Sequence, residues 1–516
     1  MRAGFRASLF ILLLLATIHP FLAGETPQIP EQDFSAAITA FSQYAEKQIQ
    51  RDQIPGMSIG FLKDDFVWTR GFGFADLENS VPAKPESSYR LASITKTITA
   101  IAVLQLVEAG KIDLDHEVQT YVPYFPQKKW PITIRQLLGH LGGISHYRDP
   151  DKETHFKDHK DTREALAVFQ DFNLVAKPGA RYFYSSYGFN LLGAVIEGAS
   201  GQTYGDFIRE HIFDPLKMSS SGMDSPTELI PHRVKGYRLL GGKVVNSEFV
   251  DVSSRFAGGG TRSSVADLLK YAQGILAGKL LQPDSWKTMF SSQATRGGYL
   301  TGYGMGWNVQ PLKGHYQVSH GGAQPETRTY LLLFPAENFA VAVAANLERA
   351  DLTPYILRLL ELVLNEDLDS RAYLRDPWEQ PLYNAALQTF AMGLSQYSFH
   401  GGITARNIQD QKQAFDYFNQ TLDPNALKQD PRAARKKLAA GIHPAAEEAF
   451  SKVGSYMASK LVSTYGKDRL KVYRQDMLAF FSDYLAIADN PYSLNPDFSR
   501  LVREWKKDWT ITYTPS

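Results

Sequence analysis

The sequence has no cysteine, and it has almost no excess of charge of either sign. The first absence excludes disulfide bonds, thiolate nucleophiles and cysteine-based metal sites. Lysine and arginine number 55 against 54 aspartate and glutamate residues, so the formal net charge is +1. A nucleic-acid-binding face normally needs a clear basic excess, and we therefore expect no nucleic-acid partner.

Metal-ligand patterns are also missing. No H-E-x-x-H sequence occurs, the pattern that places two histidine ligands on one face of a zinc-binding helix. His400 and His443 each stand alone, and an isolated histidine is more often a surface or capping residue than a ligand. We expect neither a metal ion nor a cofactor.

Long hydrophobic runs are absent except near the N-terminus. The apolar segment Leu9–Ile18 follows a start that contains Arg2 and Arg6, and the small residues Ala23 and Gly24 come after it. This order is typical of a secretory signal peptide, here residues 1–24, with a retained anchor as the alternative. We expect an exported protein, periplasmic or extracellular, without a stable membrane span after signal cleavage.

The 516 residues allow two or three domains. In the N-terminal part, apolar spacing predicts a helix over Gln32–Gln50, and the sequence predicts strands over Met57–Phe61 and Phe66–Phe72. Charged residues at 63–65 favour a hairpin turn between the strands. Thr97–Ala109 is apolar on nearly every side, as a buried helix would be.

Two more strands are predicted far along the chain. Thr329–Phe334 and Phe339–Ala344 are strongly strand-like, and the residues between them favour a turn. The stretch Asp115–Gly242 is mostly helical by pattern, with short loops. Strands at both ends and helices between them predict an α+β domain whose sheet is assembled from both ends of the domain and packs against a helical insert.

The character of the sequence changes beyond about Asn365, where strand signals end. Three apolar stripes follow at helical spacing: Phe450, Val453, Met457 and Leu461, with Gly466 as a natural stop; Leu470, Tyr473, Met477 and Phe480; and Phe498, Leu501, Trp505 and Trp509. We predict a separate helical unit over residues 366–516 and find no catalytic constellation in it.

Ser93 and Lys96 form an S-x-x-K pattern at the start of the predicted buried helix. Positions i and i+3 share a helix face, so the lysine would meet the serine hydroxyl. Burial lowers the pKa of a lysine, which can then accept the serine proton and activate a weak nucleophile. Free N–H groups at the helix start can hold a developing oxyanion. An ordinary helix start capped by serine is the alternative.

Two later segments contain further candidate residues. Tyr184 lies between a Pro-Gly turn and a predicted helix; a phenol can relay protons, although a core aromatic is the simpler interpretation. His320 precedes Gly321 and Gly322, which let a ligand approach the backbone closely. The N–H group of Ala323 can supply a second oxyanion donor. A glycine-rich hairpin with a surface histidine is the alternative.

In chain order, these segments resemble the signature of the serine β-lactamases and penicillin-binding proteins: S-x-x-K, then Y-x-N, then K-T-G or H-x-G. Other stretches are similar to the group that contains class C β-lactamases, D-alanyl-D-alanine carboxypeptidases and related esterases, namely Tyr89–Lys96, Thr133–Ile144, Phe256–Leu268 and Tyr303–Trp307. The neighbourhoods of His146-Tyr147 and Tyr184-Ser185-Ser186 are most similar to the mitochondrial serine β-lactamase-like branch and its bacterial relatives. The resemblance covers about residues 35–360.

The resemblance implies a β-lactamase/transpeptidase-like fold for residues 25–365, with an antiparallel sheet flanked by helices. It implies that Ser93 is the acylated nucleophile and that Lys96 activates it. Tyr184 matches the tyrosine that serves as base for acylation and as acid for the leaving group. The backbone N–H groups of Ser93 and Ala323 match the oxyanion hole.

The residues expected to contact substrate are Ser186, His320, Gly321 and Gly322. Two of them depart from the family pattern. Ser186 stands in place of asparagine and makes fewer hydrogen bonds. His320 stands in place of lysine and is neutral near pH 7 unless perturbed, which weakens capture of a substrate carboxylate.

We therefore expect a serine hydrolase that forms a Ser93 acyl-enzyme with a small-molecule or peptide acyl substrate. An ester or an amide fits, as in an esterase, a peptidase or a D-alanyl carboxypeptidase-like enzyme. A true β-lactamase is one alternative. A non-catalytic binding or scaffold protein on the same fold is another, although the joint presence of Ser93, Lys96 and Tyr184 argues against it.

Overall fold

The structure is a computed structural model. It describes residues 33–296, 301–309, 312 and 317–364 and, further on, 382, 385–386, 389–390, 408–430, 449–469, 472–473 and 477–512. The predicted signal over residues 1–24 lies outside the described residues, as do His400 and His443, and export stays a prediction. Within the described ranges, no helix combines the length and the apolarity needed to cross a bilayer.

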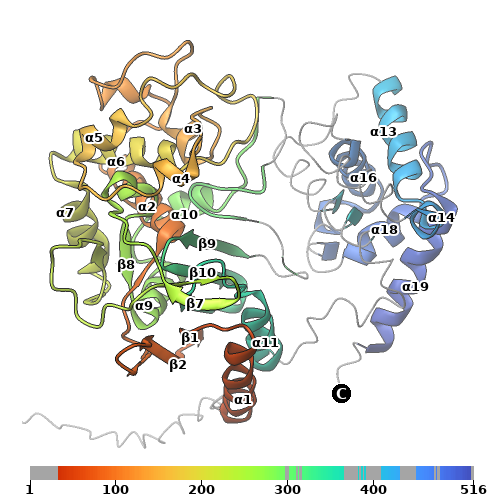
Figure 1. Cartoon of the computed structure of the whole chain (residues 1–516). Coiled ribbons are helices and arrows are strands. Elements are labelled where there is room, and N and C mark those ends of the chain that lie inside the picture. Colours follow the sequence, from red (N-terminus) through yellow and green to blue (C-terminus); the bar gives the residue numbers. More distant parts are fainter. Residues whose placement is uncertain are drawn as a thin grey trace, which may run out of the picture.

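A six-stranded antiparallel sheet lies at the centre of the N-terminal part of the chain (Figure 1). In spatial order its strands are β3 (Val81–Pro82), β2 (Phe66–Asp76), β1 (Gly56–Lys63), β11 (Phe339–Ala345), β10 (Thr327–Phe334) and β9 (Val318–Gln324). β1 pairs with β11, so that Met57 lies opposite Ala345. The α+β fold class and a sheet built from both ends of the domain are therefore confirmed.

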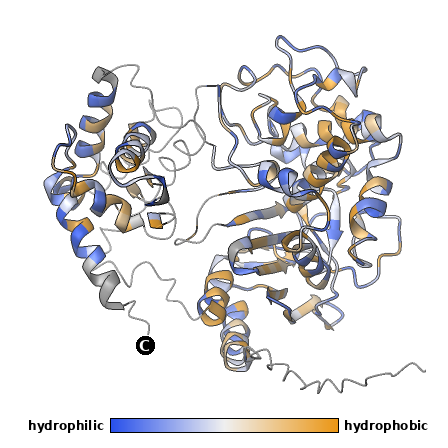
Figure 2. Cartoon of the chain, turned by 180° about the vertical axis from the view of Figure 1, so that it is seen from behind, coloured by the Kyte–Doolittle hydropathy of each residue, from blue (hydrophilic) through white to orange (hydrophobic). Residues whose placement is uncertain are grey.

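Both faces of the sheet are covered at its central strand β11, where successive side chains point to opposite faces and all are buried. In β11, Val341 and Val343 join a core with α1 (Ser35–Arg51) and α11 (Thr353–Leu364). Ala340, Ala342 and Ala344 face the larger core on the other side. Figure 2 shows hydrophobic residues gathered on the sheet and on the helices that cover it.

The helix α2 (Thr95–Glu108) runs through that larger core and is buried on nearly every side. It begins two residues before the predicted start, directly after a 3-10 turn over Ala92–Ile94. The helix α9 (Val265–Leu276) packs between this core and strands β1 and β11. The Ala92–Ile94 turn thus leads directly into a buried helix of the larger core.

The region 115–242 is less helical than predicted. Its α-helices are α3 (Ile134–Leu138), α4 (Pro150–Glu153), α5 (Thr162–Ala167), α6 (Ser186–Ser200) and α7 (Tyr204–Ile208), which a π-helical turn over Arg209–Phe213 extends. The region also holds the strands β5 (Gly222–Met223) and β6 (Tyr237–Leu240), and β6 pairs with β7 (Lys243–Asn246). Capping boxes begin α3 and α5, but α3 ends within five residues at Gly139. The capping residues mark where these helices begin, but the apolar pattern predicted more helix than the structure contains.

The described residues beyond position 380 are mainly helical. The helices are α13 (Ile408–Thr421), α14 (Pro424–Gln429), α16 (Ala449–Tyr465), α18 (Met477–Leu485) and α19 (Pro496–Thr512). The predicted stripe on α16 is buried, and Gly466 follows that helix with a φ of +84°. These helices share a hydrophobic core of their own, while the domain boundary at residue 365 stays a prediction.

Candidate active site

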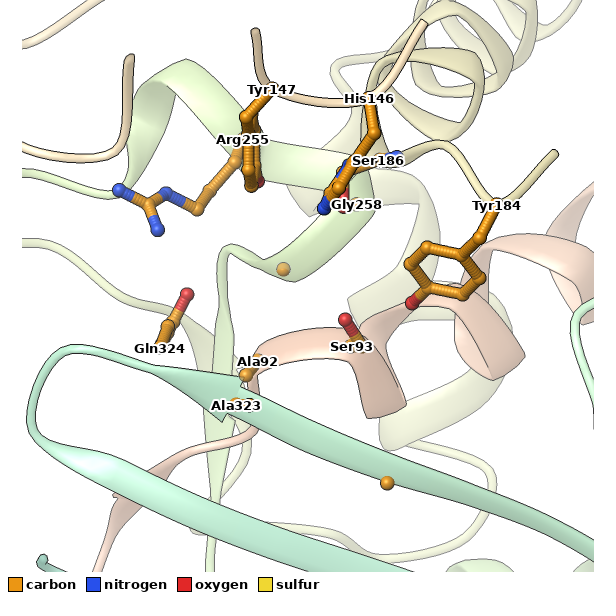
Figure 3. Close-up of a pocket in the computed structure, with 12 residues that line it drawn as sticks. Ala92, Ser93, His146, Tyr147, Tyr184, Ser186, Arg255, Gly258, Ala323 and Gln324 are labelled. Atoms are coloured by element: carbon orange, nitrogen blue, oxygen red, sulfur yellow. Dashed lines mark hydrogen bonds between the residues drawn. The ribbon is translucent and has the colours of Figure 1, made fainter. Parts of the chain in front are cut away.

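The Ala92–Ile94 turn, which contains the candidate nucleophile Ser93, has a residue in an unusual backbone conformation. Ala92 has a φ of +48°, which is unfavourable for a residue with a Cβ and is often found at functional sites. The turn from Ala92 to Ile94 leads into α2 and places Ser93 on the wall of a cavity of about 240 Å³ (Figure 3). Gly322 of β9 packs against the same turn, since a Cβ there would lie 2.3 Å from the Leu91 carbonyl oxygen.

Lys96 is completely buried one helical turn after Ser93. Its Nζ lies 3.0 Å from Ser93 Oγ, 3.0 Å from Ser186 Oγ and 2.6 Å from the Gly258 carbonyl oxygen. Burial, and to a smaller extent the Arg255 guanidinium, hold the pKa of Lys96 well below its usual value. Lys96 Nζ donates to all three of these oxygens. When it gives up one proton, two N–H groups can stay on Gly258 and Ser186, and its lone pair can then accept from the Ser93 hydroxyl.

Figure 3 shows the Tyr184 hydroxyl directed at Ser93, the side chain with which it interacts. Lys96 Nζ lies 5.0 Å from the centre of the Tyr184 ring. Burial raises the pKa of Tyr184, while its hydrogen bond to Ser93 lowers it by less. The site therefore favours a neutral Tyr184 phenol, which can act as an acid, beside Lys96, which loses its proton more easily than a free lysine and can act as a base.

Helix α6 supplies Ser186 and, one turn later, a residue that sequence reasoning missed. Asn190 is fully buried; its Oδ1 accepts from the Gly258 N–H at 3.1 Å, and its Nδ2 donates to the Ser254 carbonyl at 2.8 Å. The same Gly258 peptide gives its carbonyl to Lys96. Asn190 thus fixes the peptide that orients the lysine.

His320 lies behind the cavity wall and is buried. Its Nδ1 lies 2.8 Å from the Gly321 carbonyl oxygen and its Nε2 3.0 Å from the Tyr303 hydroxyl. A carbonyl only accepts, so Nδ1 carries the proton and Nε2 accepts from Tyr303. Burial, together with the nearby Lys96, lowers the pKa of His320 to about 3. The position of the third-motif lysine therefore carries no charge near neutral pH.

Two backbone N–H groups remain as candidates for the oxyanion hole. Ser93 is the middle residue of the Ala92–Ile94 turn and Ala323 lies on β9, the edge strand of the sheet; both line the cavity. Donors fixed by a helix start and a sheet need no rearrangement to receive a developing negative charge.

A model of the β-lactamase family matches residues 41–363, more than half of the chain. The chain belongs to the β-lactamase family. It is 32% identical over 331 residues to the mitochondrial serine beta-lactamase-like protein LACTB of Homo sapiens. The alignment covers 50% of this chain and 60% of that protein. The chain thus spans about three fifths of the length of this curated relative.

Solved structures agree with this membership. The octameric penicillin-binding protein homologue from Pyrococcus abyssi is 27% identical with a TM-score of 0.59, over 67% of this chain and 81% of that one. A D-stereospecific amidohydrolase from Streptomyces sp. is 26% identical with a TM-score of 0.55, over 64% of this chain and 99% of that one. The resemblance inferred from the motifs and the β-lactamase/transpeptidase-like fold are confirmed.

The β-lactamase-family site brings most of the candidate residues to one cavity. Those on its wall are Ser93, Tyr184, Ser186, Gly321 and Ala323. Lys96 lies beneath Ser93, while His320 and Gly322 lie within the protein behind the wall. The sequence interpretation did not assign site roles to the other residues that line the cavity, namely Ala92, His146, Tyr147, Arg255, Gly258, Gly259 and Gln324. Arg255 directly precedes the glycine-rich Phe256–Gly260 segment, and the family resemblance of that segment is the only sequence feature that could have indicated Arg255.

Proposed function

We propose that this protein is a hydrolase that cleaves an ester or an amide through an acyl-enzyme on Ser93. The observation that carries the proposal is the buried Lys96 Nζ, 3.0 Å from Ser93 Oγ, with its other contacts on Ser186 and Gly258. A serine with an adjacent neutral amine is an activated nucleophile.

The proposed reaction begins when Ser93 Oγ attacks the substrate carbonyl carbon. The hydroxyl proton passes to Lys96, and the N–H groups of Ser93 and Ala323 hold the oxyanion. As the carbonyl re-forms, the bond to the leaving group breaks; the Tyr184 hydroxyl protonates that group and is reprotonated from Lys96. The products of this half-reaction are the acyl-Ser93 ester and the free alcohol or amine.

Deacylation follows the same route in reverse. Water attacks the ester carbon and gives one proton to the Lys96–Tyr184 pair, and the tetrahedral species expels Ser93 Oγ, which takes that proton back. The burial that lowers the pKa of Lys96 and raises that of Tyr184 supports this order, with lysine as base and tyrosine as proton donor.

The choice of an ester or amide over a β-lactam rests on the third motif. His320 is neutral and hydrogen-bonded to Tyr303 behind the cavity wall, so this position supplies no cation for a β-lactam carboxylate. The similarity to a D-stereospecific amidohydrolase supports an amide.

The decisive experiment compares wild type with Ser93→Ala on activated esters, anilides and nitrocefin. We expect the variant to lose at least about three orders of magnitude in kcat/KM, and a fluorophosphonate to label wild type on Ser93 only. Ser463→Ala, an exposed serine on α16, is the matched control. Equal activity in S93A refutes the mechanism, and absence of any adduct on Ser93 favours a non-catalytic scaffold. Nitrocefin turnover above about 10⁴ M⁻¹s⁻¹ identifies a true β-lactamase instead.

A further inference from the structure

The charge on the cavity wall is one-sided. Of the described residues that line the cavity, Arg255 alone carries a permanent charge, and none is acidic. His146, also on the wall, has its pKa lowered to about 4 by burial and by the positive charges of Lys96 and Arg255. In this cavity Arg255 would repel a substrate ammonium group, and no lining carboxylate would bind it, whereas Arg255 would attract an anionic group.

No carboxylate among the described residues pairs with the Arg255 guanidinium. The residue is only 3% exposed. One Nη donates to the Thr154 carbonyl, and Nε has no hydrogen-bond partner in the part of the chain that the structure describes. No ion pair joins Arg255 to any described carboxylate; Asp251, the acidic group that acts on it, accepts instead from the Ser253 N–H. Buried charges are normally paired, so the guanidinium retains the capacity to bind an anion.

His146 adds a neutral donor to the same wall. Its Nδ1 accepts from the Ser186 backbone N–H at 3.2 Å. The proton of the neutral imidazole therefore sits on Nε2. A carboxylate in this cavity thus finds a guanidinium and an imidazole N–H, and both are held by backbone contacts of their own.

The position of Arg255 shows which part of the substrate it meets. Tyr184, the proposed donor to the leaving group, has its ring 6.2 Å from that of His320 near the beginning of β9. Gln324 is four residues further along, about 13 Å in an extended strand, and lies beside Gly259 of the segment that follows Arg255. Figure 3 shows Tyr184 on one side of Ser93, and Arg255 and Gln324 on the other.

We infer that the acyl portion of the substrate, not its leaving group, carries an anionic group such as a carboxylate, and that Arg255 binds it. The leaving group departs toward Tyr184, so the group that stays on Ser93 extends toward Arg255 and Gln324. Half-esters and half-amides of dicarboxylic acids, and acyl groups with an acidic side chain, have this chemistry. The inference rests on the proposed Ser93 acyl-enzyme, and it makes Arg255 a specificity-determining residue.

The test compares two amides of 7-amino-4-methylcoumarin that share the leaving group and the number of acyl carbons, the glutaryl and the pentanoyl amide. We expect wild type to favour the glutaryl amide at least tenfold in kcat/KM. In Arg255→Gln this preference should fall at least tenfold, and in Arg255→Lys it should be intermediate, because lysine keeps the charge but not the planar fork. Arg209→Gln, at an exposed arginine that pairs with Asp206, should keep the wild-type preference.

A binding measurement separates this inference from the proposed function. Calorimetry of both amides with Ser93→Ala, alone and combined with Arg255→Gln, reports charge recognition without catalysis. We expect Ser93→Ala to bind the glutaryl amide at least tenfold more tightly than the pentanoyl amide, and the double variant to lose that difference. Equal binding of the two amides by Ser93→Ala, or a wild-type preference for the pentanoyl amide, overturns the inference. If neither amide is turned over but the glutaryl preference in binding depends on Arg255, the reaction is wrong and the anion site stands.

Discussion

Gly322→Ala is expected to separate β9 from the Ala92–Ile94 turn that carries Ser93. A Cβ at this position would lie 2.1 Å from Thr329 Oγ1 and 2.3 Å from the Leu91 carbonyl oxygen, whereas ordinary contact begins at 3.4 Å. Thr329 Oγ1 itself donates to the Leu91 carbonyl at 2.8 Å, so neither atom can move without the other. The strand and the turn must therefore move apart by about 1 Å, a misplacement that costs about 10²-fold in rate.

The assay for this variant is kcat/KM on an activated ester together with the thermal midpoint of unfolding. We expect a loss of about 10²-fold in kcat/KM and a loss of about 1–3 kcal/mol in unfolding free energy from overpacking. Gly222→Ala is the matched control, because a Cβ there has no neighbour within 4 Å. A Gly322→Ala variant that keeps kcat/KM within threefold of wild type would refute the argument that the oxyanion hole depends on this contact.

Two further substitutions test the proton carriers and their support. Lys96→Met should lower kcat/KM by at least about three orders of magnitude and raise the thermal midpoint. The pKa of Lys96 is lower in the folded protein than its usual 10.5, so unfolding takes up a proton. The stability of the wild type therefore falls as the pH drops from about 10.5 toward the folded pKa. The thermal midpoint, measured at several pH values, should depend less on pH in Lys96→Met than in wild type, and an equal dependence would contradict the shift. Asn190→Ala leaves the Gly258 N–H and the Ser254 carbonyl without partners, so about 1–3 kcal/mol of stability per group and part of the activity should be lost, with kcat falling more than KM changes. A variant with unaltered kcat would show that Asn190 has no part in positioning Lys96.

Several parts of the site could be predicted because they depend on local sequence. Ser93 and Lys96 meet through i, i+3 spacing at a helix start. The four predicted strands combine β-branched and aromatic residues with clear turns, and all four are present with slightly longer bounds. These features can be predicted without knowing which segments pack against them.

Other parts depend on contacts between distant segments. Arg255 reaches the cavity from a position more than 150 residues after Ser93, and nothing in its own neighbourhood indicates an unpaired guanidinium. The acid–base character of Tyr184 depends on its burial, which a single sequence does not show. His320 was expected beside substrate by resemblance, yet its side chain bonds to Tyr303 within the protein. Tertiary contacts decide each of these outcomes.

The pairing of β1 with β11 has a consequence for biosynthesis. The paired residues are about 290 positions apart in the chain. A ribosome adds about 5–20 residues per second, so the β1–β2 hairpin waits roughly 15–60 seconds for its partner strand. During that interval the buried edge of β1, with Met57, Ile59 and Phe61, is an open template for pairing with other chains. The nascent protein therefore depends on a chaperone that covers this edge more than a fold of neighbouring hairpins would.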